Sequence, residues 1–184
     1  MRITGGRHRG RRLATPRGSE LRPTSDNVRE SLFNILAHGR HTKGVTGTRV
    51  LDAFAGTGAL GLEALSRGAT HATFMDTDRA AVTDIKHNLT MLDEDERSTV
   101  LRTDTILPPR PAAPVEIAFL DPPYRSGLVH SAIKALATAG WFAPGALLVV
   151  ELAADEDLPL PPRTALSDNR RYGNTRIIFL HITQ

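Results

Sequence analysis

The 184-residue chain contains no cysteine, and this absence excludes several kinds of chemistry. Without thiols the chain can form neither disulfides nor thiolate zinc sites, and no mechanism can use a cysteine nucleophile. Long apolar runs are also missing. None approaches the ~20 residues that would span a bilayer, so we expect no membrane segment and a cytoplasmic protein. The seven histidines form no metal-ligand spacing such as H-E-x-x-H, so we expect no metal.

The charge of the chain is small but unevenly distributed. The length is that of about one domain and the net charge is +3, yet the first 22 residues hold seven arginines against one glutamate. A basic arm on a slightly acidic body indicates a polyanionic partner that is reached by one end of the molecule. We therefore divide the chain into a basic arm, residues 1–22, and a body, residues 23–184. Within the arm we expect residues 2–4 and 11–13 to pair as a short ribbon.

A glycine-rich turn follows a short β-type run that ends in Asp52. Gly56, Gly58 and Gly61 formally match the dinucleotide fingerprint G-x-G-x-x-G, and Asp76 lies twenty positions past Gly56. An oxidoreductase that binds a nicotinamide or flavin dinucleotide is therefore one interpretation. Asp52 argues against it, because a carboxylate at the strand end would face the pyrophosphate that should rest on the helix N-terminus.

The same carboxylate suits a ligand with an ammonium group, such as the methionine part of S-adenosylmethionine. In this interpretation the tight turn lets the backbone approach the ligand, while Asp76, at the end of the next strand, binds both ribose hydroxyls. The pattern therefore favours a methyl donor over a dinucleotide.

A second motif, Asp121-Pro122-Pro123-Tyr124, directly follows an apolar run typical of a buried parallel strand. The two prolines end the strand and hold the backbone extended, since proline fixes φ and biases the preceding residue away from helix. These groups match a planar base with an exocyclic amino group. Asp121 and the Pro122 carbonyl can accept the two amino hydrogens, and Tyr124 can stack on the base. Four residues alone would also fit a proline-rich turn with a surface tyrosine.

Helical and strand patterns alternate along the chain. This alternation predicts an α/β, Rossmann-like fold with a seven-stranded, mostly parallel sheet, helices on both faces and a C-terminal antiparallel hairpin. The helices are expected after residue 26 and over residues 59–67, 79–92 and 127–139, the later strands over 115–120 and 146–151, and the hairpin over 164–172 and 175–182. Asp52, Asp76, Asp104 and Asp121 each follow a separate strand, so all four should meet at one rim, where ligands bind in such folds.

Together these residues resemble the class I S-adenosylmethionine-dependent methyltransferases. The whole chain resembles the RsmD family of bacterial enzymes, which methylate guanine N2 in small-subunit (16S) ribosomal RNA. The most specific matches are residues 2–13, 22–24, 29–34, 52–58, 63–69 and 121–124. The resemblance implies that S-adenosylmethionine is bound by Asp52, Phe54, Ala55, Gly56, Gly58, Asp76, Thr77, Thr103 and Asp104. It implies a catalytic loop of Asp121, Pro122 and Tyr124. We expect RNA contacts from Arg2, Arg7, Arg9, Arg11, Arg12, Arg22, Thr24 and Arg29.

The expected partner is 16S ribosomal RNA within a partly or fully assembled small ribosomal subunit, and the expected state is a monomer. The guanine assignment depends on the resemblance, because the Asp121 loop would serve any exocyclic amine. An adenine-N6 methyltransferase acting on DNA or RNA therefore remains the alternative, followed by the dinucleotide oxidoreductase and by an RNA-binding protein without activity.

Overall fold

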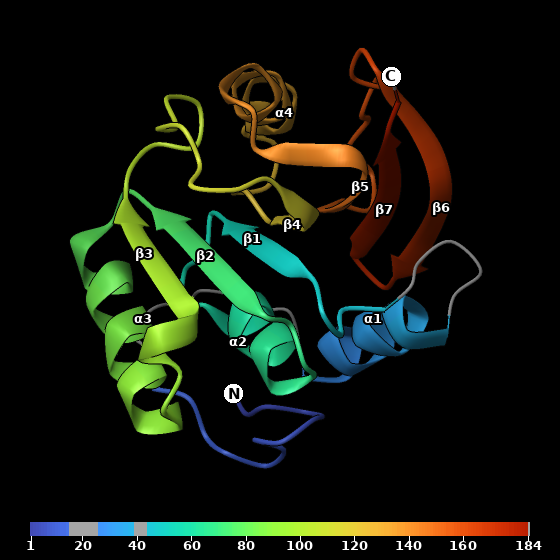
Figure 1. Cartoon of the computed structure of the whole chain (residues 1–184). Helices are drawn as coiled ribbons and strands as arrows, with labels where there is room; N and C mark the ends of the chain where they lie inside the picture. The colour runs from blue at the N-terminus through green and yellow to red at the C-terminus, as the bar shows by residue number, and fades with distance from the viewer. Residues whose placement is uncertain (15–25, 39–43, 184) are drawn as a thin grey trace.

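The computed structural model describes residues 1–14, 26–38 and 44–183, and in these residues seven strands form one sheet (Figure 1). The strands are β1 (Arg49–Ala53), β2 (His71–Asp76), β3 (Ser98–Arg102), β4 (Val115–Leu120), β5 (Phe142–Ala153), β6 (Thr164–Tyr172) and β7 (Thr175–Ile182). The helices are α1 (Asp26–His38), α2 (Ala59–Ser66), α3 (Arg79–Leu92), the 3-10 turn η1 (Asp95–Arg97) and α4 (Leu128–Ala139).

The strand order is β3-β2-β1-β4-β5-β7-β6. Strands β1 to β5 are parallel, whereas β7 runs antiparallel to β5 and β6 antiparallel to β7. The chain moves outward from β1 to β3 on one side and then crosses to β4 on the other. Ligands of open α/β sheets bind at such a switch point, outside the carboxyl ends of the strands. The predicted fold class, including the antiparallel hairpin, is confirmed.

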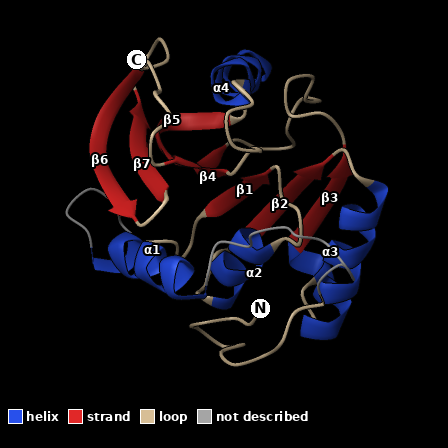
Figure 2. Cartoon of the chain, turned by 180° about the vertical axis from the view of Figure 1, so that it is seen from behind, coloured by secondary structure: helices blue, strands red, loops and turns tan. Residues whose placement is uncertain are grey.

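Each face of the sheet has its own apolar core, because successive side chains of a strand point to opposite faces. Val50 packs with α1, α2 and α3, whereas its neighbour Leu51 packs with α4. Figures 1 and 2 show α4 alone on one face and the other three helices on the opposite face. The proline-rich segment after β3 forms no helix. The Trp141 indole anchors this segment by donating a hydrogen bond to the Pro109 carbonyl oxygen over 2.7 Å.

The N-terminal arm is folded against the body. The Ile3 amide donates to the Arg11 carbonyl, and a β-bridge joins Arg2 to Arg12, so the predicted pairing is confirmed. Ile3 and Leu13 are buried in the same core as α1 and α2. Residues 1–14 are therefore part of the helical layer. The boundary that we placed at residue 22 lies outside the described residues.

None of the helices in the described residues is both long enough and apolar enough to cross a membrane.

Candidate active site

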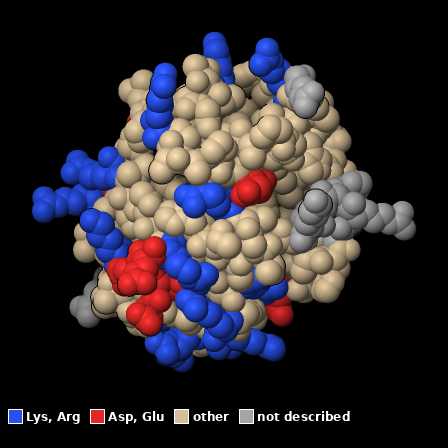
Figure 3. Space-filling view, in the orientation of Figure 1, with Lys and Arg blue, Asp and Glu red and all other residues tan. Residues whose placement is uncertain are grey.

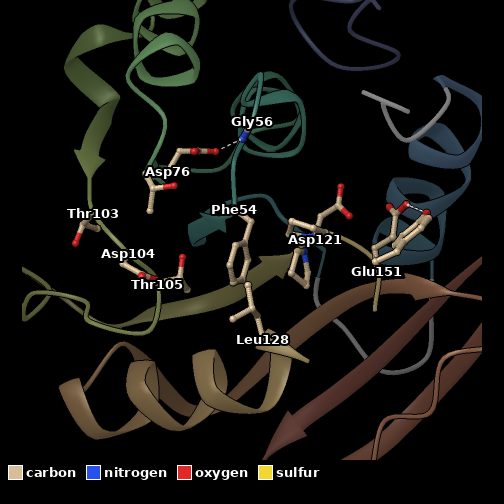
Figure 4. A pocket seen from close by; sticks show the side chains of 13 residues that line it. Phe54, Gly56, Asp76, Thr103, Asp104, Thr105, Asp121, Leu128 and Glu151 are labelled. Carbon is tan, nitrogen blue, oxygen red and sulfur yellow. Dashed lines mark hydrogen bonds between the residues drawn. The ribbon is translucent and has the colours of Figure 1, made fainter. Parts of the chain in front are cut away.

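A pocket of about 560 Å³ opens at the carboxyl ends of the parallel strands. Its lining residues come from the ends of β1 to β5 and the start of α4: Phe54, Gly56, Asp76, Thr77, Thr103, Asp104, Thr105, Asp121, Pro122, Pro123, Tyr124, Leu128 and Glu151. Figure 4 shows two sides of this pocket. Asp76, Thr103 and Asp104 lie on one side, Asp121 and Glu151 lie on the other, and Phe54 lies between them. The glycine turn and the Asp121 loop therefore meet in one cavity, as the sequence predicted.

The turn after β1 is held in a conformation that few side chains tolerate. Phe54 has φ 63°, Gly56 has φ 53° and Gly58 has φ 76°. The Gly56 amide donates to Asp76 Oδ2 over 2.8 Å, which ties the turn to the end of β2. A Cβ added at Gly56 would meet no protein atom within 4 Å, so the backbone borders open space there. The turn therefore leaves room for a ligand to approach the main chain.

Asp52 lies beneath the turn rather than in the pocket wall. Its side chain is buried, and its Oδ2 accepts a hydrogen bond from the Gly61 amide over 2.8 Å. Burial and the nearby Asp76 carboxylate raise the pKa of Asp52 to about 7, although the Gly61 hydrogen bond acts in the opposite direction. Ala55 and Gly58, two other predicted cofactor residues, also lie outside the pocket lining. All three belong to the turn that borders the pocket.

On the side of the pocket opposite the Asp121 loop, backbone amides hold the carboxylates of two aspartates. Asp76 Oδ1 accepts from the Asp78 amide over 2.9 Å, in addition to the bond from Gly56, and Asp104 Oδ1 accepts from the Ile106 amide over 3.0 Å. A carboxylate has about four acceptor positions, so each aspartate can still accept hydrogen bonds from a ligand. This side suits a ligand that carries hydroxyl and amino donors.

The Asp121 loop forms the other side. Pro122 is buried, and the Tyr124 hydroxyl donates to Glu151 Oε1 over 3.0 Å and lies 2.9 Å from Thr175 Oγ1. Burial raises the pKa of Tyr124 to about 12, and Glu151 contributes. Burial and the carboxylates of Glu151 and Asp52 raise the pKa of Asp121 well above its usual range. The loop therefore presents a fixed phenol beside the Asp121 carboxyl group, whose raised pKa favours a proton or a hydrogen-bond donor.

Three further residues line the pocket, Glu151, Thr105 and Leu128, and Thr175 fixes Tyr124. None of these four residues was predicted to belong to the site. Glu151 could have been found. Like the four aspartates, it ends a predicted apolar strand, residues 146–151, and so belongs at the same rim.

The residues predicted to contact RNA differ in whether their side chains already bind other groups of the protein. Three arm arginines have protein partners: Arg2 pairs with Asp26, Arg7 with Glu94, and Arg11 donates to the Met91 carbonyl. In the described residues Arg9 and Arg12 are exposed and have no such partner. Figure 3 shows Lys and Arg side chains gathered at the edge where Figure 1 places the arm. Arg22 and Thr24 lie outside the described residues.

The prediction for Arg29 is wrong. Its side chain is fully buried, and its guanidinium binds Asp26, Glu63 and the Arg2 carbonyl oxygen. A phosphate could not reach it without dismantling this cluster. Arg29 therefore joins α1, α2 and the arm and has a structural role.

Known proteins share this fold and much of this sequence. The chain matches the family described as Conserved hypothetical protein 95 over residues 1–181. "Ribosomal RNA small subunit methyltransferase D" of Escherichia coli K12 is 42% identical over 162 residues, covering 88% of this chain and 79% of that protein. The protein of the same name from Haemophilus influenzae is 36% identical over 177 residues, covering 94% and 89%.

Solved structures agree with these relatives. The structure of yhhF from Escherichia coli superposes with a TM-score of 0.86 at 36% identity, covering 100% of this chain and 98% of that one. An RNA methyltransferase from Salinibacter ruber in complex with S-adenosyl-L-homocysteine shares the fold, with a TM-score of 0.68 at 12% identity over 88% of this chain and 94% of that one. The chain belongs to the Conserved hypothetical protein 95 family, the family of the ribosomal RNA small subunit methyltransferases D.

Proposed function

We propose that this protein transfers a methyl group from S-adenosylmethionine to the exocyclic N2 of a guanine in 16S ribosomal RNA, within a partly or fully assembled small subunit. Family membership supports the reaction and the class of RNA. The observation that carries the proposal is that the Gly56 turn and the Asp121–Tyr124 loop line one pocket. A methyl donor and an amine can therefore meet there.

The residues present fit the cofactor. Asp76 and Asp104 accept hydrogen bonds from ribose hydroxyls and from the adenine amino group, Thr77 and Thr103 complete this side, and Phe54 and Gly56 border the methionine portion. The carboxylates near the turn stabilise the positive charge of the ligand. When bound, S-adenosylmethionine supplies an electrophilic methyl group on a sulfonium.

The Asp121 loop prepares the amine. The exocyclic nitrogen of guanine is a poor nucleophile, because its lone pair is delocalised into the ring. Asp121 and the Pro122 carbonyl hold the two amino hydrogens, which favours a pyramidal nitrogen and directs its lone pair toward the methyl. Holding the amine in this way would supply most of the catalysis, because methyl transfer depends mainly on the positions of the two reactants. The same acceptors stabilise the positive charge that develops on nitrogen. The raised pKa of Asp121 suits it to take up the proton that nitrogen loses afterwards.

Tyr124 holds the base. Stacking on an aromatic ring contributes ~1–3 kcal/mol per base, which offsets part of the cost of taking the guanine out of its own stack. The hydrogen bonds of the Tyr124 hydroxyl to Glu151 and Thr175 fix the ring before RNA arrives, so its ordering adds little cost on binding. Arg9 and Arg12 of the arm contact phosphates and position the RNA without selecting the base.

The test is the variant Asp121→Ala, compared with Asp157→Ala, an exposed aspartate on a loop outside this pocket. Asp121→Ala should lower methylation of small-subunit particles by about 10²–10³-fold, as expected when one preorganised electrostatic partner of the reacting atom is lost. Its affinity for S-adenosylhomocysteine, measured by calorimetry, should remain within a factor of about three, since Asp121 lies on the base side. Normal turnover in Asp121→Ala would show that the role proposed for Asp121 is wrong.

The identity of the methylated nucleoside distinguishes guanine-N2 from adenine-N6 methylation. After incubation of particles with labelled cofactor, the RNA is digested to nucleosides, and N2-methylguanosine is the expected labelled product. N6-methyladenosine would instead support the adenine alternative, and label in neither nucleoside would contradict the proposal.

A further inference from the structure

Arg125 lies directly after the Asp121–Tyr124 loop, in a backbone conformation that arginine rarely adopts. Its φ is 56°, in the left-handed region that favours glycine. The Arg125 amide donates to Glu156 Oε2 over 2.9 Å, and its Nη2 donates to both carboxylate oxygens of Asp155, over 2.8 Å to Oδ2 and 3.0 Å to Oδ1. A side chain at this position costs free energy that glycine would not, so the arginine needs a reason to be there.

The ion pair with Asp155 is not a sufficient reason. Both side chains are 68% exposed, and exposed ion pairs contribute little to stability because water screens them. Among the residues that the structure describes, Asp155 is the only group that hydrogen-bonds to this guanidinium, and it does so through Nη2 alone. A guanidinium carries five N–H donors in all, so Arg125 can bind another anion.

Arg125 is placed at the mouth of the pocket, on the side proposed for the target base. Pro123 and Tyr124 line the pocket, whereas Arg125 does not. Adjacent Cα atoms lie about 3.8 Å apart, so this side chain begins one residue away from the ring proposed to stack on the base. In a nucleotide the phosphates are joined to the base through the ribose and lie outside the stack. We therefore expect a base held on Tyr124 to bring its phosphates to the surface where Arg125 lies.

A phosphate would be a better partner for Arg125 than Asp155 is. Asp155 contacts a single nitrogen, whereas a phosphate can accept two parallel hydrogen bonds from two nitrogens, which is the stronger geometry. Asp155 also keeps a cationic neighbour if Arg125 turns away. The pKa of its carboxyl group is lowered mainly by Arg125, and Arg171 of β6 contributes as well. Exchange of one partner for the other therefore leaves neither charge isolated.

We propose that Arg125 binds a phosphate beside the target nucleotide, exchanging Asp155 for the RNA backbone when the base enters the pocket. This inference rests on the proposed function and deepens it, because it adds an RNA contact at the pocket mouth to those of the arm. Phosphate contacts position a nucleic acid without selecting its base, so Arg125 is a positioning residue for the target nucleotide.

The test compares two variants that break the same ion pair. Arg125→Gln and Asp155→Asn each replace an exposed side chain, so both should fold. Arg170→Gln is the matched control, since Arg170 forms an exposed ion pair with Asp168 on β6 and does not line the pocket. Affinity for small-subunit particles that lack the methyl mark is measured with S-adenosylhomocysteine present, over a range of salt concentrations.

The two variants should change the affinity for the particles in different directions. Arg125→Gln should flatten the slope of log affinity against log salt by about 0.7, which amounts to about fivefold in affinity over a tenfold range of salt. Asp155→Asn should bind at least as tightly as the wild type, and up to about fivefold more tightly, because an exposed ion pair no longer has to be broken. Arg170→Gln should keep the wild-type slope.

A neutral methylphosphonate at either linkage beside the target guanine locates the contact. At one of these linkages it should weaken binding of the wild type but should not weaken binding of Arg125→Gln any further. An equal effect on both proteins at both linkages would overturn the inference, as would an unchanged salt slope in Arg125→Gln. Weaker binding of Asp155→Asn than of the wild type would mean that the ion pair only anchors the loop, and this too overturns it. Failure of the proposed function looks different, since the wild type would then form no N2-methylguanosine on the particles.

Discussion

The buried carboxylate of Glu63 should hold the N-terminal arm in place. On α2, Glu63 is fully buried and accepts hydrogen bonds at 2.7–2.8 Å from the Thr4 amide and hydroxyl, the Gly5 amide and Arg67 Nε. It also lies 3.4 Å from Nε of the buried Arg29. We predict that Glu63→Gln destabilises the protein although the two side chains have the same shape, because one acceptor oxygen becomes an amide that faces only donors.

The size of the destabilisation in Glu63→Gln follows from the buried groups that lose their partner. Breaking a buried ion pair costs ~3–5 kcal/mol, and each charge-assisted hydrogen bond contributes ~1.5–3 kcal/mol. These effects overlap, so we expect a loss of about 3–5 kcal/mol in the free energy of unfolding. For a domain of this size, that loss lowers Tm by about 6–20 °C.

Thermal unfolding and hydrogen exchange test this prediction. Glu30→Gln on α1 is the matched control, because Glu30 is exposed and surface changes of this kind stay within about 0.5 kcal/mol. In Glu63→Gln the Thr4 and Gly5 amides should also lose protection from exchange before the central strands do. Equal Tm values for the two variants, with both amides still protected, would refute the idea that this carboxylate holds the arm.

Two further predictions concern the pH profile and the RNA. Asp52→Asn should gain stability over the wild type as pH rises. The pKa of Asp52 is raised to about 7 in the folded protein, so ionised Asp52 disfavours the folded state. The free energy of unfolding of Asp52→Asn should therefore differ little from that of the wild type below pH 4 and exceed it by at most about 4 kcal/mol above pH 7. Urea unfolding across this pH range measures the stability difference between the two proteins. A difference that does not change with pH would contradict the prediction. Arg9→Gln combined with Arg12→Gln should flatten the slope of log affinity for RNA against log salt by about 0.7 per lost contact, hence by about 1.4 in total. An unchanged slope would mean that these arginines do not touch phosphate, and S-adenosylhomocysteine affinity serves as the control.

Local patterns were sufficient to predict the elements that build the site. The predicted strand over residues 115–120 coincides with β4, and the predicted hairpin coincides with β6 and β7, because Gly173 and Asn174 mark the turn between two runs of β-type residues. Strand β5 begins at Phe142, earlier than the predicted residue 146, since Pro144 and Gly145 interrupt the apolar pattern. The prediction that the site residues meet at one edge of the sheet followed from the topology, because the carboxyl ends of parallel strands lie at the same edge.

Long-range partners could not be predicted in the same way. Arg29 has the sequence context of a surface helix residue, and its burial depends on distant partners such as Glu63, 34 positions away. Asp52 ends a strand, as predicted, but that position could not predict the hydrogen bond that its carboxylate accepts from the Gly61 amide of α2. For Arg29 and Asp52 the missing information was which distant segment packs against them. Glu151 differs, because its position at the end of a predicted apolar strand already placed it at the rim.

The folded arm has a consequence for how RNA is presented to the pocket. Asn88 of α3 is fully buried, accepts a hydrogen bond from the Ala14 amide over 2.8 Å, and donates to the carbonyls of Ala14 and Thr57. It thereby joins Ala14 of the arm to the turn that carries Gly56. A flexible basic tail would raise the local RNA concentration but would leave the distance between phosphate and pocket open. An arm fixed to the glycine turn sets that distance before RNA binds. We therefore expect phosphates bound by Arg9 and Arg12 to position the target base relative to the methyl donor as well.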